Sequence, residues 1–198
     1  MGLDGIGWDW MRLADLPDDG SQHKEIYAFF GLAMYQASVF EVAVANAIVP
    51  FKIAIEQGSF ATREEFHEAF DLEMASQFKR GLGDLLRTLG KVHALPKELG
   101  GQFHRVLDRR NFLAHHFFRE NAETFYSVAG REEMLGFIRS SIAMFDDATD
   151  ALADFLQPKL DAVGLTKGRL AAEFRIYLQD VRNRASDLDD VPLAEGPE

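Results

Sequence analysis

Cysteine is absent from the 198-residue chain, so no disulfide can form and no thiolate can bind a metal. A reducing compartment such as the cytoplasm suits such a chain. Segments with the pattern of β-strands are nearly absent as well. The N-terminus has no basic region followed by an apolar run, so it does not have the form of a signal peptide. These absences favour an all-α cytoplasmic protein.

Positive charge is also scarce, with 21 lysines and arginines against 32 acidic residues and a net charge of −11. Such a chain is a poor candidate for non-specific coating of nucleic acid or anionic lipid. The positive charge is concentrated, however. Residues 104–119 hold four arginines against one aspartate, together with His104, His115 and His116. This basic segment lies around an apolar stripe, which is unusual for a solvated helix face.

Helical periodicity predicts an up-and-down bundle of four to six helices. We expect an N-terminal arm over residues 1–20, one helical domain over 21–184, and a disordered acidic tail over 185–198. Helices are predicted from Ser21 to Gly58 with a bend near Pro50, from a capping box at Thr62 and Glu65, as a short glycine-broken helix over 78–90, from Pro96 to Phe118, from Gly130 to Pro158, and from Thr166 onward.

The first predicted helix is unusually apolar, because Glu41 is its only charged residue between Ile26 and Phe51. A run of this length raises the question of a membrane span. Polar residues such as Gln36 and Asn46 interrupt it, and no second span follows. We therefore expect a buried central helix rather than a membrane anchor.

The segment "RRNFLAHHFFRE", residues 109–120, places a permanent cation in an apolar arc. At about 100° per residue, Arg110 falls in the middle of the arc formed by Phe103, Leu107, Leu113 and their neighbours. A buried guanidinium must be paired, because an uncompensated buried charge costs several kcal/mol. Glu41, the lone charge of the apolar helix, is the natural partner.

Polar groups lie on one border of the same arc. Asn111 and His115 fall there, with His104 and Asp108 on the same flank, whereas Arg105, Arg109 and His116 face away. Histidine can give and take a proton near neutrality, and arginine presents a fork that fits phosphate oxygens. The alternative is a structural Arg–Glu pair with polar residues at its edge.

The sequence Arg110-Asn111 followed by His115 ("RNFLAH") resembles the motif of HEPN domains, which consists of an arginine, usually a polar residue after it, and a histidine four to six residues beyond the arginine. The resemblance covers roughly residues 21–160. It implies an all-α homodimer that acts as a metal-independent endoribonuclease of toxin–antitoxin or phage-defence systems, with RNA and an antitoxin-like protein as partners and no cofactor.

The same resemblance assigns roles to the residues of the motif. His115 would transfer the proton at the RNA 2′-OH, Arg110 would bind the scissile phosphate, and Asn111 would orient it. The products would be a 2′,3′-cyclic phosphate and a 5′-OH. One group of HEPN toxins has a tyrosine two residues after the histidine, which its antitoxin modifies. Phe117 stands there in this chain, so that regulation is not expected.

Other interpretations stay open. A non-catalytic helical dimer that binds a protein partner or regulator is the main rival, and the acidic composition favours it. His104 and Asp108 have the spacing of a metal-ligand pair, but His115 lies almost three turns beyond His104, so we expect no metal site. The remaining histidines and polar pairs are interpreted as surface or capping positions: His23, His67, His93, Ser140–Ser141 and Asp146–Asp147.

Overall fold

A computed structural model describes residues 22–56 and 62–162, with a few single positions between 166 and 183. The predicted N-terminal arm and acidic tail lie outside the described residues, as does most of the predicted last helix. The chain divides into two compact units, residues 1–152 and 153–198. The contacts discussed below all lie within the first unit.

Helices account for nearly all of the described residues, and residues 22–56 and 62–162 contain no β-strand. The helices are α1 (Gln22–Glu56), α2 (Arg63–Gln77), α3 (Leu82–His93), α4 (Lys97–His115), α5 (Phe117–Glu120) and α6 (Val128–Ala162), with a short 3-10 turn, η3 (Thr124–Tyr126), before α6. The prediction of an all-α protein with four to six helices is therefore confirmed for the part of the chain that the structure describes.

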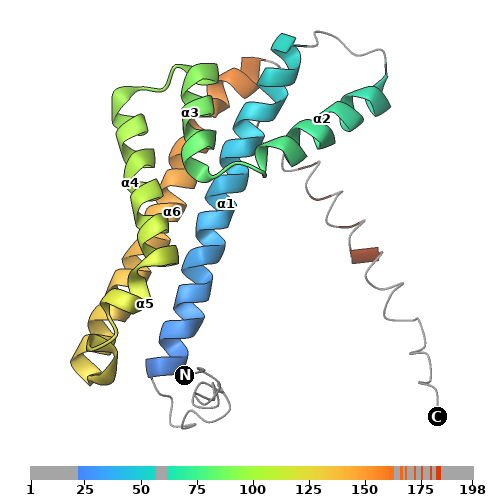
Figure 1. Cartoon of the computed structure of the whole chain (residues 1–198). Coiled ribbons are helices and arrows are strands. Elements are labelled where there is room, and N and C mark those ends of the chain that lie inside the picture. The colour runs from blue at the N-terminus through green and yellow to red at the C-terminus, as the bar shows by residue number, and fades with distance from the viewer. Residues whose placement is uncertain are drawn as a thin grey trace, which may run out of the picture. The chain divides into compact units, whose positions relative to one another are not determined.

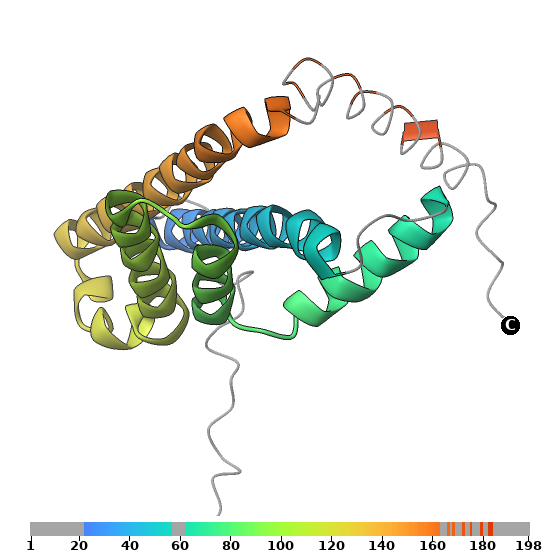
Figure 2. The same cartoon turned by 90° about the horizontal axis from the view of Figure 1, so that it is seen from above.

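Helices α1 and α4 lie side by side and run in opposite directions, and the first part of α6 runs along α4 (Figures 1 and 2). Helix α3 packs on the C-terminal half of α1, and α2 crosses the same end of α1 (Figure 1). Aromatic side chains join the long helices. The Phe40 and Phe103 rings are 5.2 Å apart between α1 and α4, and the Phe112 and Phe137 rings are 5.3 Å apart between α4 and α6.

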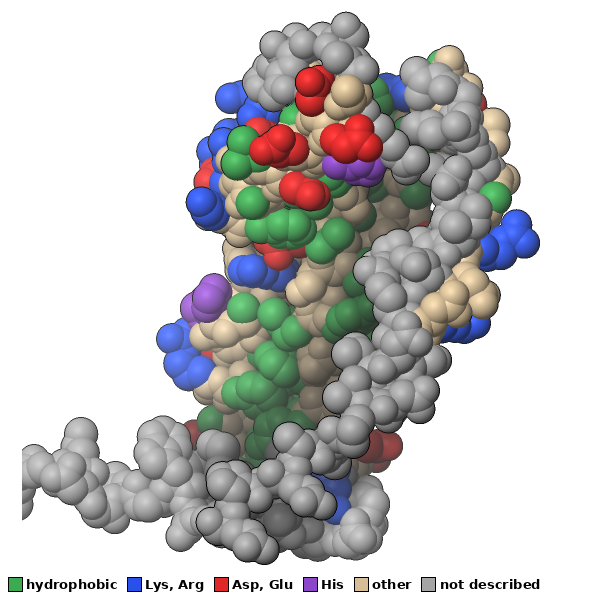
Figure 3. Space-filling model, turned by 90° about the vertical axis from the view of Figure 1, so that its right-hand side faces the viewer, with side chains coloured by type: hydrophobic (Ala, Val, Ile, Leu, Met, Phe, Trp, Pro, Cys, Tyr) green, Lys and Arg blue, Asp and Glu red, His purple; other side chains and the backbone are tan. Residues whose placement is uncertain are grey.

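Helix α1 supplies much of the core, but it also has an apolar outer face. Its inner residues, from Ile26 through Phe40 to Ile53, are almost completely buried. By length and composition alone, α1 is the one described helix that could cross a membrane, yet only 28% of its most apolar window is buried. Leu32, Tyr35 and Val42 are among the exposed large apolar side chains, and hydrophobic side chains gather on this side of the molecule (Figure 3). The prediction of a buried central helix therefore holds for one face only.

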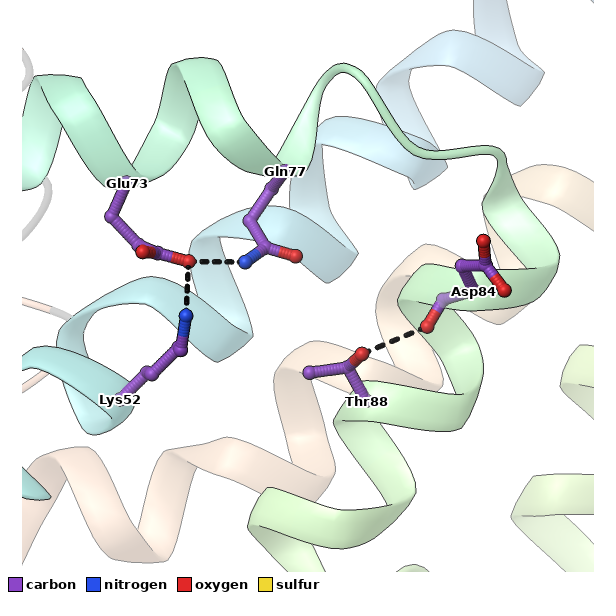
Figure 4. A network of polar contacts seen from close by, with 5 residues as sticks. All are labelled: Lys52, Glu73, Gln77, Asp84 and Thr88. Carbon is purple, nitrogen blue, oxygen red and sulfur yellow. Dashed lines mark hydrogen bonds and ion pairs between the residues drawn. The ribbon is translucent and has the colours of Figure 1, made fainter. Parts of the chain in front are cut away.

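A small network of polar contacts links α2 to α1. The Lys52 Nζ atom lies 2.8 Å from the Glu73 Oε1 atom, and the Gln77 amide donates a second hydrogen bond to the same oxygen (Figure 4). The Gln77 side chain is fully buried, and its Oε1 atom has no partner within the described residues. A neutral amide directed at a carboxylate, beside a lysine, stabilises the ionised form of Glu73.

The helix boundaries differ from the sequence prediction near the glycines and prolines. Helix α6 begins at Val128 rather than after Gly130, because the Ser127 Oγ atom accepts a hydrogen bond from the Gly130 N–H at 3.0 Å and caps the helix. Helix α3 runs unbroken through Gly83 and Gly90, and α6 continues through Pro158 to Ala162. The helix start at Thr62 is confirmed, since the Thr62 side chain accepts from the Glu65 N–H and acts as the N-cap.

His93 was expected at a surface or cap position, and this expectation is wrong. Its side chain is only 5% exposed, and its Nε2 atom lies 2.7 Å from the Ala47 carbonyl oxygen of α1. The Phe51 ring packs edge-on against it, with 4.4 Å between the ring centroids. The histidine therefore satisfies a backbone carbonyl and ties the end of α3 to α1, a tertiary contact that no local sequence pattern indicates.

Substitution of two glycines in α6 should change stability in opposite directions. At Gly130 a Cβ atom would overlap the Thr124 backbone carbonyl, so Gly130→Ala is expected to lower the free energy of unfolding by about 1–3 kcal/mol. At Gly136 a Cβ atom meets nothing within 4 Å, so Gly136→Ala should raise it by about 0.5–1 kcal/mol. Urea unfolding of both variants would measure this; equal effects would contradict the tight turn at residues 124–127.

Glu73 should make stability depend on pH. Burial alone raises the pKa of its carboxyl, but hydrogen bonds from Lys52 and Gln77 and the charges of Lys52 and Arg80 outweigh burial, so the pKa lies below its ordinary value. A lowered folded-state pKa stabilises the fold above the unfolded-state value of about 4.3, and this contribution is lost as pH falls through the folded-state pKa.

We therefore expect Glu73→Gln to lower the melting temperature at pH 7, and the gap to the wild type to close as pH falls from about 5 to about 3. Glu68→Gln, at an exposed position of the same helix, is the matched control. A gap that stays constant over this range would show that the ionised carboxylate contributes nothing.

Candidate functional site

The residues of interest lie on α4 and the short helix that follows it. Pro96 precedes α4 as its N-cap residue, where a missing N–H costs nothing. The helix ends at His115, and α5 begins after the non-helical backbone of His116. Phe103, Val106 and Leu113 form the buried side of α4. The chain was predicted to stay helical to Phe118, but the helix breaks at His116, and this changes the orientation of the two residues that follow.

Arg110 was expected to be buried, and it is half-buried, with 28% of its side chain exposed. Its Nη2 atom lies 3.9 Å from the Glu41 Oε2 atom, and its Nη1 atom donates to the Asn111 Oδ1 atom at 3.2 Å. Glu41 is the expected partner, but the ion pair is long and partly solvated. Such a pair orients the guanidinium and compensates its charge only weakly.

Asn111 and His115 lie four residues apart on α4, which makes them neighbours on the helix surface. Asn111 is half-buried and His115 is exposed. Within the described residues, His115 makes a ring contact with His116, at 6.3 Å between centroids, and no side-chain hydrogen bond or ion pair with Arg110 or Asn111. The structure thus brings Glu41, Arg110 and Asn111 together and leaves the imidazole free in solvent nearby.

The other predicted site residues do not join this group. His104 and Asp108 are exposed. The His116 Nδ1 atom lies 2.6 Å from the Arg119 Nη2 atom and 3.7 Å from the Glu120 Oε1 atom, so His116 belongs to a separate surface cluster. Residues 22–56 and 62–162 contain no group of three or more histidines and acidic residues that could hold a metal ion.

Two hollows lie beside α4, one against α3 and one against α6. One, of about 350 Å³, lies between α3 and α4 and includes His104 among its lining residues. The other, of about 370 Å³, is more open and lies between α4 and α6; it is lined by Arg105, Asp108, Arg109, Phe112, Phe137 and Met144. Neither hollow includes Arg110, Asn111 or His115 among its lining residues.

Arg109 is the residue that the sequence analysis misjudged most. It was predicted to face away into solvent, but its Nη1 atom donates to the Ser141 Oγ atom at 3.0 Å and to the Ser140 Oγ atom at 3.2 Å. Its guanidinium lies 4.2 Å from the centroid of the Phe137 ring. Burial lowers the pKa of Arg109.

Ser141, expected to be a solvated position, is fully buried. A signal for this contact was available in the sequence. Phe137, Ser141 and Met144 follow one another at helical spacing, as do Arg105, Arg109 and Phe112 on α4, and such stripes pack when two helices are neighbours. The pairing of α4 with α6 was the missing information.

The fold and the site define an all-α protein in which α4 carries an arginine and an amide beside Glu41, an exposed imidazole at its end, and a second arginine towards α6. Comparison of the chain with models of protein families, with curated proteins and with solved structures found no match.

The Glu41–Arg110 pair should contribute little to stability. In a double-mutant cycle with Glu41→Gln and Arg110→Gln, we expect a coupling energy below about 1 kcal/mol, because the pair is long and partly exposed. Chemical denaturation of the wild type, both single variants and the double variant would measure it. A coupling of several kcal/mol would mean that the pair is a buried structural element.

Proposed function

We propose that this chain is a HEPN-like, metal-independent endoribonuclease. The single observation that supports it is that Arg110, Asn111 and His115 all lie in the last part of α4 and are all reached by solvent, with the guanidinium held between Glu41 and Asn111. This arrangement matches the roles that the motif resemblance assigns. The Arg110 guanidinium can bind a phosphate, and the exposed His115 imidazole can transfer a proton.

The proposed reaction uses the RNA itself as nucleophile. His115 takes the proton of the 2′-OH, the 2′-oxygen bonds to the adjacent phosphorus, and the bond from phosphorus to the 5′-oxygen breaks. The 5′-oxygen takes a proton from water and leaves as a hydroxyl, His115 returns to water the proton that it took, and the other product carries a 2′,3′-cyclic phosphate. Arg110 stabilises the charge that develops on the phosphate oxygens, and Asn111 holds the guanidinium in position.

We further propose that two copies associate so that their motifs face one groove. The exposed apolar side chains of α1 support this, since an exposed apolar stripe commonly marks an interface. In this proposal the protein is a cytoplasmic toxin or phage-defence component controlled by an antitoxin-like protein, with no cofactor and no membrane.

The same apolar stripe favours a second candidate function from another class. A non-catalytic helical dimer that binds a protein partner or regulator would also need an exposed apolar face. The absence of the three motif residues from the two hollows described above is consistent with this alternative. RNA cleavage by the purified protein would distinguish the ribonuclease from the partner-binding alternative.

Purified protein incubated with RNA in EDTA should cleave it and leave 2′,3′-cyclic phosphate ends. His115→Ala should reduce the rate by about 10²–10⁴-fold, because a proton-transfer group is lost. Arg110→Ala should reduce it by about 10²–10³-fold, because transition-state charge is left unstabilised. Gel analysis of end-labelled RNA and the susceptibility of the ends to phosphatase would measure both.

His67→Ala is the matched control, because His67 is an exposed histidine on α2. This variant should cleave at the wild-type rate. RNA that stays intact with every substrate tried, or cleavage that survives His115→Ala unchanged, would reject the enzyme and favour the partner-binding alternative.

A further inference from the structure

The residues that line the hollow between α4 and α6 have no role in the proposed ribonuclease reaction. Two arginines and one aspartate line it, together with Phe112, Phe137 and Met144. His115 is not among its lining residues, and its volume of about 370 Å³ is within the range of small-ligand sites. Its walls combine aromatic and thioether surface with guanidinium groups.

Arg109 is the central feature of this hollow. It forms no ion pair with a carboxylate within the described residues, and its hydrogen bonds go to two neutral serine hydroxyls. Both bonds come from its Nη1 atom, so the Nε and Nη2 groups have no protein acceptor within residues 22–56 and 62–162. A half-buried guanidinium normally has a compensating anion, because desolvation of an unpaired charge is costly.

The surroundings of Arg109 fix its orientation. The guanidinium lies over the Phe137 ring at 4.2 Å, and Ser141, which positions it, is itself held by a hydrogen bond to the Phe137 carbonyl at 2.8 Å. Ser140 donates to the same carbonyl at 2.8 Å. Both hydroxyl protons are thereby used, which leaves the serine oxygens as acceptors for Arg109. A guanidinium held in this way is pre-organised for an oxyanion.

We propose that this hollow is a binding site for a small ligand that carries a phosphate or carboxylate on a flat apolar group. The oxyanion would accept from the Nε and Nη2 groups of Arg109, whose planar fork matches two oxygens. The apolar group would lie on Phe112 and Met144. Arg105 adds positive charge, and Asp108 opposes it, so the lining keeps a net positive charge of one.

Phenyl phosphate is the probe that combines both features, and inorganic phosphate, benzoate and phenol separate them. We expect phenyl phosphate to bind more tightly than inorganic phosphate and phenol in calorimetric titrations of the full chain. Benzoate in place of phenyl phosphate distinguishes a carboxylate ligand from a phosphate ligand. Failure of both aryl anions to bind at millimolar concentration would overturn the proposal.

Variants test whether Arg109 holds the oxyanion. Arg109→Gln should weaken phenyl phosphate binding at least tenfold, and Arg105→Gln should weaken it severalfold. Arg87→Gln, at an exposed arginine of α3 outside this hollow, should leave it unchanged. Equal binding by the wild type and a folded Arg109→Gln variant would overturn the proposal.

An NMR titration of the wild type covers the case in which Arg109→Gln does not fold. Phenyl phosphate should shift the backbone amide signals of residues 105–112 on α4 and 137–144 on α6. Shifts centred on other helices would overturn the site. The proposal is independent of ribonuclease activity, because His115→Ala, which should stop RNA cleavage, should bind phenyl phosphate as the wild type does.

Discussion

The packing of α4 between α1 and α6 is the constraint on which the rest of the structure depends. Two consecutive arginines on this helix point about 100° apart, so each reaches a different neighbour. Arg110 meets Glu41 of α1, and Arg109 meets Ser140 and Ser141 of α6. The Phe40–Phe103 and Phe112–Phe137 contacts keep both neighbours in place. The 100° between the two residues explains how one short basic segment can supply two chemically different surfaces.

The two arginines also differ in how their charge is compensated. Arg110 has a carboxylate at 3.9 Å, which is too far for a strong pair, and its exposed fraction leaves room for a closer anion. A phosphate oxygen at hydrogen-bond distance would interact more strongly than Glu41 does, and a long, solvated pair costs little to break. Arg109 has no carboxylate within the described residues and is fixed by hydroxyls and an aromatic ring.

Much of the fold was predictable because the helices of this chain are long and strongly periodic. The capping box at Thr62, the proline before α4 and the apolar character of α1 are local signals, and local signals locate helices well. The failures lie where a tertiary contact decides. His93 is buried because a carbonyl of α1 lies within its reach. The start of α6 is a different case: the local cap by Ser127 places it at Val128, three residues earlier than expected, so Gly130 lies inside the helix. The helical wheel placed Arg110 near α1 correctly, but it could not give the solvent access that leaves the side chain half-exposed.

Arg109 shows why the sites were harder to predict than the fold. A helical wheel divides one helix into an apolar face and a polar face, and it treats every residue on the polar face as solvated. Helix α4 packs on neighbours on more than one side, so a residue on its polar face can meet the polar stripe of another helix. The stripe on α6 that contains Ser141 is such a partner. The hydroxyls of Ser140 and Ser141 both donate to the Phe137 carbonyl of the same helix. A basic residue between two packed helices loses part of its hydration without gaining a carboxylate partner. In the proposed site, this uncompensated charge gives the hollow its affinity for an anion.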